Sequence, residues 1–176
     1  MAVLEIRYLG DPILRKKAAP VTEFGEELGR LVEDLLDTMY AFDGIGLAAL
    51  QIGLEQRVIV VDVSEARDRS EAIALVNPEI VTSSGTMKGE EGCLSIPGVV
   101  AEVERAERVL VRGQHPSGEP AQMEADGLLA RVLQHEIDHL NGILFIDRLG
   151  PLGRELALKE WNRVAEGRRL VPRGGL

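Results

Sequence analysis

Two of the three histidines in this chain, His135 and His139, lie four residues apart with Glu136 between them. On a helix this spacing places both imidazoles on one face, a turn apart, where they can bind the same metal ion. A metal that keeps one coordination position for water makes a nucleophile at neutral pH, and Glu136 is placed to move its proton. Two half-buried polar rings would give the same spacing without a metal, but the adjacent glutamate favours a metal site.

The single cysteine, Cys93, lies in the sequence EGCLSIPG. A lone cysteine is more often an inert small hydrophobe than a ligand. Here a glycine precedes it and a predicted Ser-Ile-Pro-Gly turn follows, so the backbone can approach a ligand closely. A thiolate with two imidazoles is a valid ligand set for a catalytic divalent metal. One cysteine also excludes an intrachain disulfide and is typical of a reducing compartment.

Three helices are predicted, over residues 22–39, 127–140 and 152–166, the first with Thr22 as its cap. In the second helix the two histidines align with Leu128 and Val132, so the predicted metal face borders an apolar face. Asp126 is expected to cap this helix and Gly142 stands just past its end. Short β-rich runs lie between the first two helices, at residues 57–63, 72–76, 79–82, 99–105, 108–112 and 120–125.

This order of elements predicts an α+β fold. We expect a single domain of short mixed or antiparallel sheets around a central HExxH metal-binding helix, with one helix near the amino terminus and one at the carboxyl terminus. Residues 1–150 are expected to form the catalytic core. Residues 151–176 would add the last helix and a basic tail to the same domain.

Composition is that of a globular protein, with 45% hydrophobic and 28% charged residues in a chain of 176. The net charge of −9 argues against binding to nucleic acid, either non-specific or sequence-specific. No apolar run is long enough to span a membrane and no signal peptide is recognisable, so a cytoplasmic location without membrane contact is expected. Residues 148–176 carry seven basic and three acidic side chains, a net of +4, whereas the first 147 residues carry a net of −13.

Three motifs in a fixed order resemble those of the peptide deformylases. They are GIGLAALQ at Gly44–Gln51, EGCLS at Glu91–Ser95 and HEIDH at His135–His139. The segment GDPILRKKAAPV near the amino terminus is also similar to that family, so the resemblance covers nearly the whole chain. It implies a hydrolase that removes the formyl group from the formylmethionine of nascent polypeptides and releases formate.

The resemblance also implies roles for individual residues. One divalent metal would be held by Cys93, His135 and His139; in the family this is natively Fe²⁺, often replaced by zinc, nickel or cobalt. Glu136 would accept a proton from the attacking water and deliver it to the departing amine.

The resemblance implies two donors for the developing oxyanion, the side-chain amide of Gln51 and the backbone N–H of Leu94. Backbone groups of Ile45 and Gly46 would bind the main chain of the substrate as an added strand.

The methionine side chain would enter an apolar pocket formed by Ile45, Leu128, Val132 and the ring of His135. Leu128 and Val132 could equally be plain core. Glu91 and Asp138 could orient the ligands or form ordinary salt bridges. A docking contact with the ribosome through the basic carboxyl-terminal segment is also implied, and Arg163, Arg168 and Arg169 are its candidate residues.

Two other readings remain open at the level of sequence. A zinc endopeptidase uses the same HExxH helix and takes a third ligand downstream, for which Asp147, Glu155, Glu160 and Glu166 are candidates. A non-catalytic binding module could instead use a closed structural metal site, which needs a fourth protein ligand and gives Glu136 no task. The endopeptidase reading leaves GIGLAALQ and EGCLS unexplained.

Overall fold

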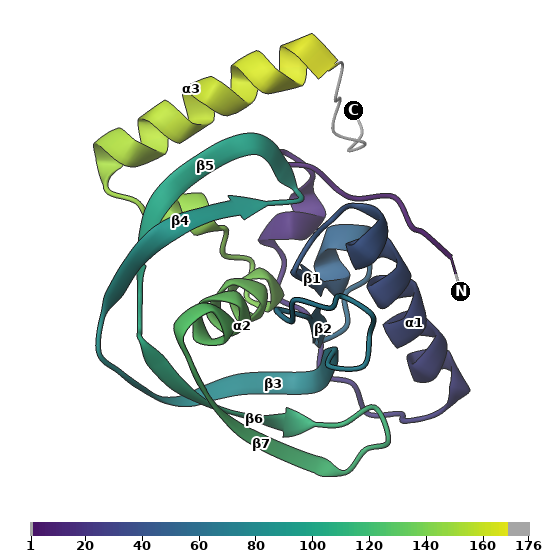
Figure 1. The fold of residues 1–176 in the computed structure, drawn as a ribbon. Coiled ribbons are helices and arrows are strands. Elements are labelled where there is room, and N and C mark those ends of the chain that lie inside the picture. Colours follow the sequence, from purple (N-terminus) through teal and green to yellow (C-terminus); the bar gives the residue numbers. More distant parts are fainter. Residues whose placement is uncertain (1, 169–176) are drawn as a thin grey trace.

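The helix that carries the two histidines runs through the middle of the molecule. The structure is a computed structural model that describes residues 2–168. In it α2 (Gly127–Leu140) lies between the sheets, while α1 (Glu26–Ala41) and α3 (Pro151–Arg168) pack outside them (Figure 1). The α+β fold with a central HExxH helix is therefore confirmed. No helix within these residues combines the length and apolar character needed to cross a membrane.

The larger sheet has five strands in the order β1-β2-β3-β6-β7, and every neighbouring pair in it is antiparallel. Since β1 is at the edge, one side of this short strand has no strand paired to it within the sheet. The strands are β1 (Gly46–Ala48), β2 (Val58–Val61), β3 (Ile73–Ser84), β6 (Arg108–Gln114) and β7 (Pro120–Asp126).

A separate antiparallel hairpin brings the cysteine to the central helix. It consists of β4 (Met87–Cys93) and β5 (Ile96–Arg105), and Cys93 pairs with Ile96 at its tip. The tight turn is therefore Leu94–Ser95, and the predicted Ser-Ile-Pro-Gly turn is wrong because its last three residues belong to β5. Cys93 thus sits at the end of a rigid strand rather than within a long loop.

Three apolar clusters fix the elements relative to one another. The first lies under the buried face of α1, which contributes Leu31, Leu35 and Met39. The second joins α2 to the five-stranded sheet through residues such as Leu133 and Ile137. The third packs α3 against β5. The chain also contains three short 3₁₀ segments, at Pro12–Arg15, Ala49–Ile52 and Phe145–Arg148.

The first helix begins four residues later than predicted, at Glu26, and Gly25 rather than Thr22 occupies its capping position. The cause lies in the preceding segment. The Val21 N–H donates to Asn77 Oδ1 at 2.8 Å, and Asn77 Nδ2 donates to the Val21 carbonyl at 2.9 Å. These bonds hold the chain in an extended form against β3, so the helix cannot start before it leaves that strand.

The strand predictions were incomplete. Two predicted runs, 72–76 and 79–82, form one strand, β3, because register shifts around Asn77 and Pro78 let the strand continue past the proline. Strands β1 and β4 were missed. The sequence of β4, MKGEEGC, is rich in glycine and charge and has low strand propensity, so only pairing with β5 makes it a strand.

The end of α2 is fixed by Gly142. Its N–H donates to the His139 carbonyl and the Ile143 N–H donates to the Asp138 carbonyl, which is the bonding pattern of a Schellman cap. Gly142 has φ of +72°, and an added Cβ would lie 2.6 Å from the Arg15 carbonyl oxygen. Glycine is required there both by the backbone conformation and by the contact.

We therefore expect Gly142→Ala to lower the free energy of unfolding by about 1–3 kcal/mol, the range for strained backbone positions. Urea unfolding followed by circular dichroism measures this loss. Gly29→Ala is the matched control: it lies within α1 with nothing within 4 Å of the added Cβ, so it should not destabilise the protein. Equal unfolding midpoints for the two variants would contradict this account of the cap.

Candidate metal centre and active site

Three side chains from two elements converge at the centre of the molecule. Cys93 comes from the end of β4, and His135 and His139 come from successive turns of α2. His139 Nε2 lies 3.3 Å from Cys93 Sγ and 3.3 Å from His135 Nε2. One ligand atom from each residue lies within 4.8 Å of the others. The structure therefore brings together the three residues that the sequence singled out.

These donors fit a divalent metal ion. Ligands held at about 2.0–2.3 Å around a tetrahedral ion lie about 3.3–3.6 Å from one another, and the two measured separations agree with this. A thiolate and two imidazoles suit first-row transition metals. Among the residues described, this is the group of His, Cys, Asp and Glu side chains that could hold a metal, and it includes no acidic residue downstream of His139.

Glu91 orients one of the histidines. Its Oε2 accepts a hydrogen bond at 2.9 Å from His135 Nδ1, which leaves Nε2 facing the other two donors. Glu91 is buried, and burial by itself would raise its pKa. The hydrogen bonds from Arg105 and His135 outweigh that effect and hold the pKa of the carboxyl well below its usual range. Glu91 is therefore an ionised acceptor that fixes the ring of His135.

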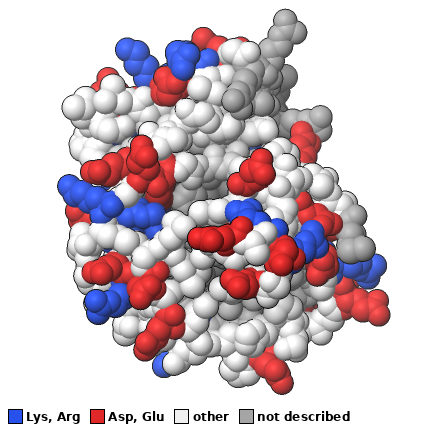
Figure 2. Space-filling model, in the orientation of Figure 1, with Lys and Arg blue, Asp and Glu red and all other residues white. Residues whose placement is uncertain are grey.

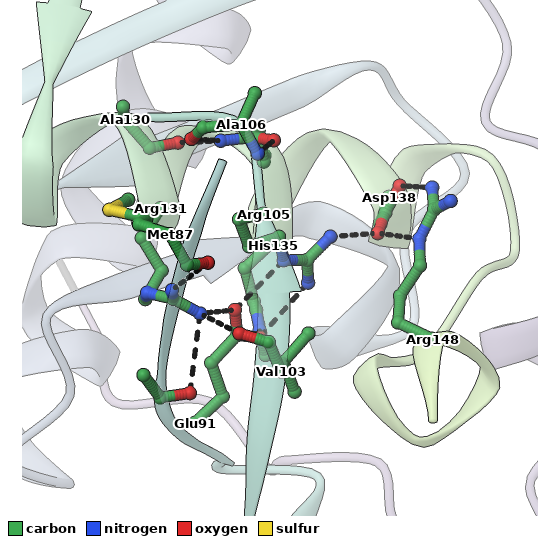
Figure 3. Close-up of polar contacts among 12 residues, drawn as sticks. Met87, Glu91, Val103, Arg105, Ala106, Ala130, Arg131, His135, Asp138 and Arg148 are labelled. Atoms are coloured by element: carbon green, nitrogen blue, oxygen red, sulfur yellow. Dashed lines mark hydrogen bonds and ion pairs between the residues drawn. The ribbon is translucent and has the colours of Figure 1, made fainter. Parts of the chain in front are cut away.

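A chain of alternating charges extends from Glu91 (Figure 3). Arg105 donates to both oxygens of Glu91, at 2.8 and 2.9 Å, and to Asp138 at 2.6 Å. Arg148 donates to both oxygens of Asp138, at 3.0 and 2.7 Å. Of the two roles left open for Glu91 and Asp138, Glu91 contacts a histidine of the cluster directly, whereas Asp138 acts one step further away through Arg105.

Glu136 lines the same cavity as Cys93 and His135, and it is almost completely buried. Its Oε2 has no hydrogen-bond partner in the described part of the chain. Burial raises the pKa of its carboxyl to about 7. A carboxyl with a pKa near neutrality can both accept and donate a proton. Gly46 makes room for it, because a Cβ at that position would lie 2.4 Å from Glu136 Oε1.

The surroundings of His139 favour the neutral form of its ring. Burial, and then the neighbouring His135, hold its pKa well below its usual value. Its Nδ1 is buried without a hydrogen-bond partner among residues 2–168. The ring is thus positioned by packing on α2 and by its Nε2 contacts, in contrast to the ring of His135.

Gln51 is oriented with its amide N–H groups toward the cluster. The Ala48 N–H donates to Gln51 Oε1 at 2.9 Å, which assigns the oxygen to that side. Its Nε2 then lies 3.2 Å from Ser95 Oγ and 3.5 Å from Cys93 Sγ. A buried amide donor therefore stands beside Cys93, which directly precedes the Leu94–Ser95 turn.

A cavity of about 420 Å³ opens next to these groups. Every residue that the sequence suggested for substrate binding lines it: Ile45, Gly46, Leu128, Val132 and His135. Val132 is buried, but Leu128 is 54% exposed and therefore is not plain core. Arg131 also lines the cavity and was missed, although its position three residues after Leu128 and four before His135 places it on the same helical face.

The α+β fold, the converging donors and the unpaired buried carboxyl together define a class of protein, the metal-dependent hydrolases. A family model described as polypeptide deformylase matches residues 3–155. A peptide deformylase of Thermodesulfovibrio yellowstonii is 49% identical over 161 residues, which cover 92% of this chain and 98% of the relative. The chain belongs to the polypeptide deformylase family.

Solved structures agree with this assignment. A peptide deformylase from Legionella pneumophila has a TM-score of 0.90 and 47% identity, and the match covers 97% of this chain and 100% of the other. A peptide deformylase from Synechococcus elongatus, in complex with actinonin, has a TM-score of 0.87 and 44% identity, and the match covers 90% of this chain and 88% of the other. This chain is accordingly an enzyme that removes the N-formyl group from nascent polypeptides. The endopeptidase and the binding module are not favoured.

The close contact between Gly46 and Glu136 generates a prediction. Gly46→Ala should displace the carboxylate, because its Cβ would also lie 2.8 Å from Val132 Cγ1 and cannot move aside. We expect at least a tenfold loss of turnover on a formylated peptide with metal content unchanged, measured by formate release and by elemental analysis. Gly29→Ala provides the control for a harmless added methyl group. Full activity of Gly46→Ala would show that Glu136 needs no fixed position.

Proposed function

We propose that Cys93, His135 and His139 bind one divalent metal ion and that Glu136 moves protons in the hydrolysis of N-formylmethionyl peptides. The observation that carries this proposal is the convergence of the three donors within 4.8 Å, beside a buried carboxyl oxygen with no partner among the described residues. Bound by these ligands, the ion would polarise the formyl carbonyl and activate water at neutral pH.

Three residues of the chain are proposed to carry out proton transfer and to stabilise the oxyanion. Glu136 takes the proton of the attacking water and then gives it to the departing amine, so that one carboxyl serves as base and acid in turn. The charge that develops on the formyl oxygen is stabilised by the Gln51 amide and by the backbone N–H of Leu94. Support for Gln51 comes from its fixed orientation, since the contact with Ala48 leaves its N–H groups for the site.

The main chain of the substrate would pair with Ile45 and Gly46. Strand β1 is the edge of the five-stranded sheet, and its inner side is already bonded to β2. The outer side borders the cavity, so an extended peptide can add to it as a further strand. The methionine side chain would then lie against Ile45, Leu128 and Val132.

We further propose Fe²⁺ as the native ion, with Zn²⁺, Ni²⁺ and Co²⁺ as substitutes. The deformylase family resemblance supports iron, and the donor set accommodates all four ions. A cytoplasmic location follows from the nature of the substrate, which is a polypeptide still being made. Residues 1–150 and the helix that follows are proposed to form one domain, because Ala157 and Trp161 share an apolar cluster with Ile96 and Phe145.

Substitutions within the site separate its roles. Glu136→Ala should abolish formate release from formyl-Met-Ala-Ser while metal remains bound, because this glutamate is not a ligand. Cys93→Ala should instead lose metal. For Gln51→Ala we expect a fall in kcat of about 10²–10³-fold, the usual loss for one oxyanion donor. If Cys93→Ala keeps its full metal content and its activity, the ligand assignment is wrong. Cleavage of casein by the unmodified protein without formate release would favour an endopeptidase.

The proposed iron can be tested through its chemistry with oxidants. An Fe²⁺ site with a thiolate ligand and a position open to solvent admits oxygen and peroxide, which oxidise both metal and sulfur. Protein purified without oxygen should contain iron and lose activity in peroxide, whereas the nickel-loaded protein should persist. Equal half-lives of the two forms would argue against inactivation that depends on the metal.

The basic carboxyl-terminal segment was expected to contact the ribosome. Arg148, Arg154 and Arg163 each pair with an acidic side chain, and Figure 2 shows both signs of charge intermixed over the face of the molecule that it presents. Arg169 lies outside the described residues, as does the side chain of Arg168. Little unpaired positive charge is therefore visible on the described part of this segment.

We nevertheless propose that this segment orients the acidic enzyme at the negative ribosome surface. Changing Arg163, Arg168 and Arg169 to glutamate should weaken cosedimentation with ribosomes and spare activity on short peptides. The binding of the unmodified protein should fall with added salt. Arg112→Glu, on β6, is the control for a charge reversal elsewhere. If the triple variant cosediments as well as the unmodified protein, the segment is only solvated surface.

A further inference from the structure

Arg131 is the one arginine or lysine among the residues that line the cavity. It is 6% exposed, and it extends from α2 toward the hairpin of β4 and β5 (Figure 3). Its Nη1 donates to Glu91 Oε1 at 2.8 Å and to the Val103 carbonyl at 2.9 Å. Its Nη2 donates to the Met87 carbonyl at 3.1 Å. The guanidinium is therefore fixed in place by both strands.

Gly89 packs directly against the guanidinium of Arg131. A Cβ at Gly89 would lie 3.1–3.2 Å from Nη2, Cζ and Nε of Arg131, which places it against the face of the guanidinium. The strand can pass this close only because residue 89 has no side chain. Gly89 and Arg131 thus form one wall of the site together, from β4 on one side and from α2 on the other.

The position of Arg131 matches the reach of a substrate side chain. It precedes His135 by four residues, which corresponds to about 6 Å along a helix. An unbranched side chain such as that of methionine extends over a similar length. Leu128, Arg131 and Val132 line the same cavity, and we place the far end of a side chain that enters between Leu128 and Val132 at Arg131.

This end of the cavity offers a hydrogen-bond donor. Arg131 donates its hydrogen bonds through Nη1 and Nη2, and its Nε–H has no acceptor among residues 2–168. Arg131 Nε is also accessible to solvent. Among residues 2–168, the side-chain atoms that are both fully buried and without a hydrogen-bond partner belong to Arg7, Arg67, Glu136 and His139. Acidic residues also line the cavity, which disfavours a charged carboxylate there and favours a neutral acceptor.

We propose that Arg131 determines specificity at the far end of the side-chain pocket, so that the enzyme deformylates peptides whose first residue ends in a neutral hydrogen-bond acceptor. Methionine sulfoxide is such a residue, because oxidation of the thioether adds one oxygen to an otherwise apolar side chain. An apolar floor would leave that oxygen without a partner. This inference rests on the proposed function, since it assumes that the formylated residue occupies this pocket.

Three peptides test the inference: formyl-Met-Ala-Ser, its sulfoxide, and formyl-norleucyl-Ala-Ser, in which a methylene replaces sulfur. For each we compare kcat/KM, from formate release, in the unmodified enzyme and in R131M and R131K. R131M keeps an unbranched stem without a donor, whereas R131K keeps a cationic donor. Both variants lose the forked contacts with Met87 and Val103, so a purely structural role would affect them alike.

We expect R131M to lower kcat/KM for the sulfoxide relative to methionine by about tenfold, the effect of one lost hydrogen bond. The ratio of norleucine to methionine should stay within about twofold, and R131K should retain most of the preference for sulfoxide. Arg112→Met, at an exposed position of β6, is the matched control and should change no ratio. The same sulfoxide ratio in the unmodified enzyme, R131M and R131K would overturn the proposal, as would an equal loss for all three peptides.

If R131M does not fold, Gly89→Ala tests the same wall with Arg131 retained. Its methyl group presses on the guanidinium, so the sulfoxide ratio should fall by at least about threefold while the norleucine ratio holds. An unchanged sulfoxide ratio in folded Gly89→Ala counts against the inference. Failure of the unmodified enzyme to release formate from formyl-Met-Ala-Ser would instead overturn the proposed function, and the inference with it.

Discussion

The ionised carboxylate of Glu91 is the point at which the fold and the candidate metal centre depend on each other. It comes from β4, it accepts a hydrogen bond from a histidine on α2, and it is bound by Arg105 from β5 and by Arg131 from α2. Removing this one acceptor would take the carboxylate partner from Arg131, leave Arg105 with Asp138 alone, and free the ring of His135 to rotate. The hairpin that delivers Cys93 is therefore locked to the helix that delivers both histidines.

Buried charge on this scale is costly, and hydrophobic residues of the same volume often stabilise a protein as well or better. Its use here is geometric. Directional hydrogen bonds fix Glu91, Arg105 and Asp138 in one arrangement, whereas apolar packing would tolerate small rotations. The apolar clusters supply stability around α2, and the charged chain supplies the orientation of His135. Rigid strands and a central helix hold the site with more precision than loops can.

The sequence predicted those parts of the molecule that depend on local spacing. The bounds of α2 follow from its apolar period, its capping positions and Gly142, and the metal cluster follows from motifs that the chain carries intact. Strands β1 and β4 could not be predicted, because one has three residues and the other has low strand propensity and exists through pairing. Arg131 was missed since a charged residue on a helix normally faces solvent. Its acceptors are Glu91 and carbonyls on β4 and β5, about 30 to 45 residues away in the chain.

X-ray absorption of the zinc-loaded protein tests the central claim most directly, because it reports the ligands of the ion itself. The account predicts one sulfur at about 2.3 Å and nitrogen or oxygen neighbours at about 2.0–2.1 Å, with two of them showing the outer scattering of imidazole. Glu91→Gln should keep the sulfur and increase the disorder of the imidazole shell. A spectrum without a sulfur neighbour, or with four protein ligands and no solvent position, would contradict the account.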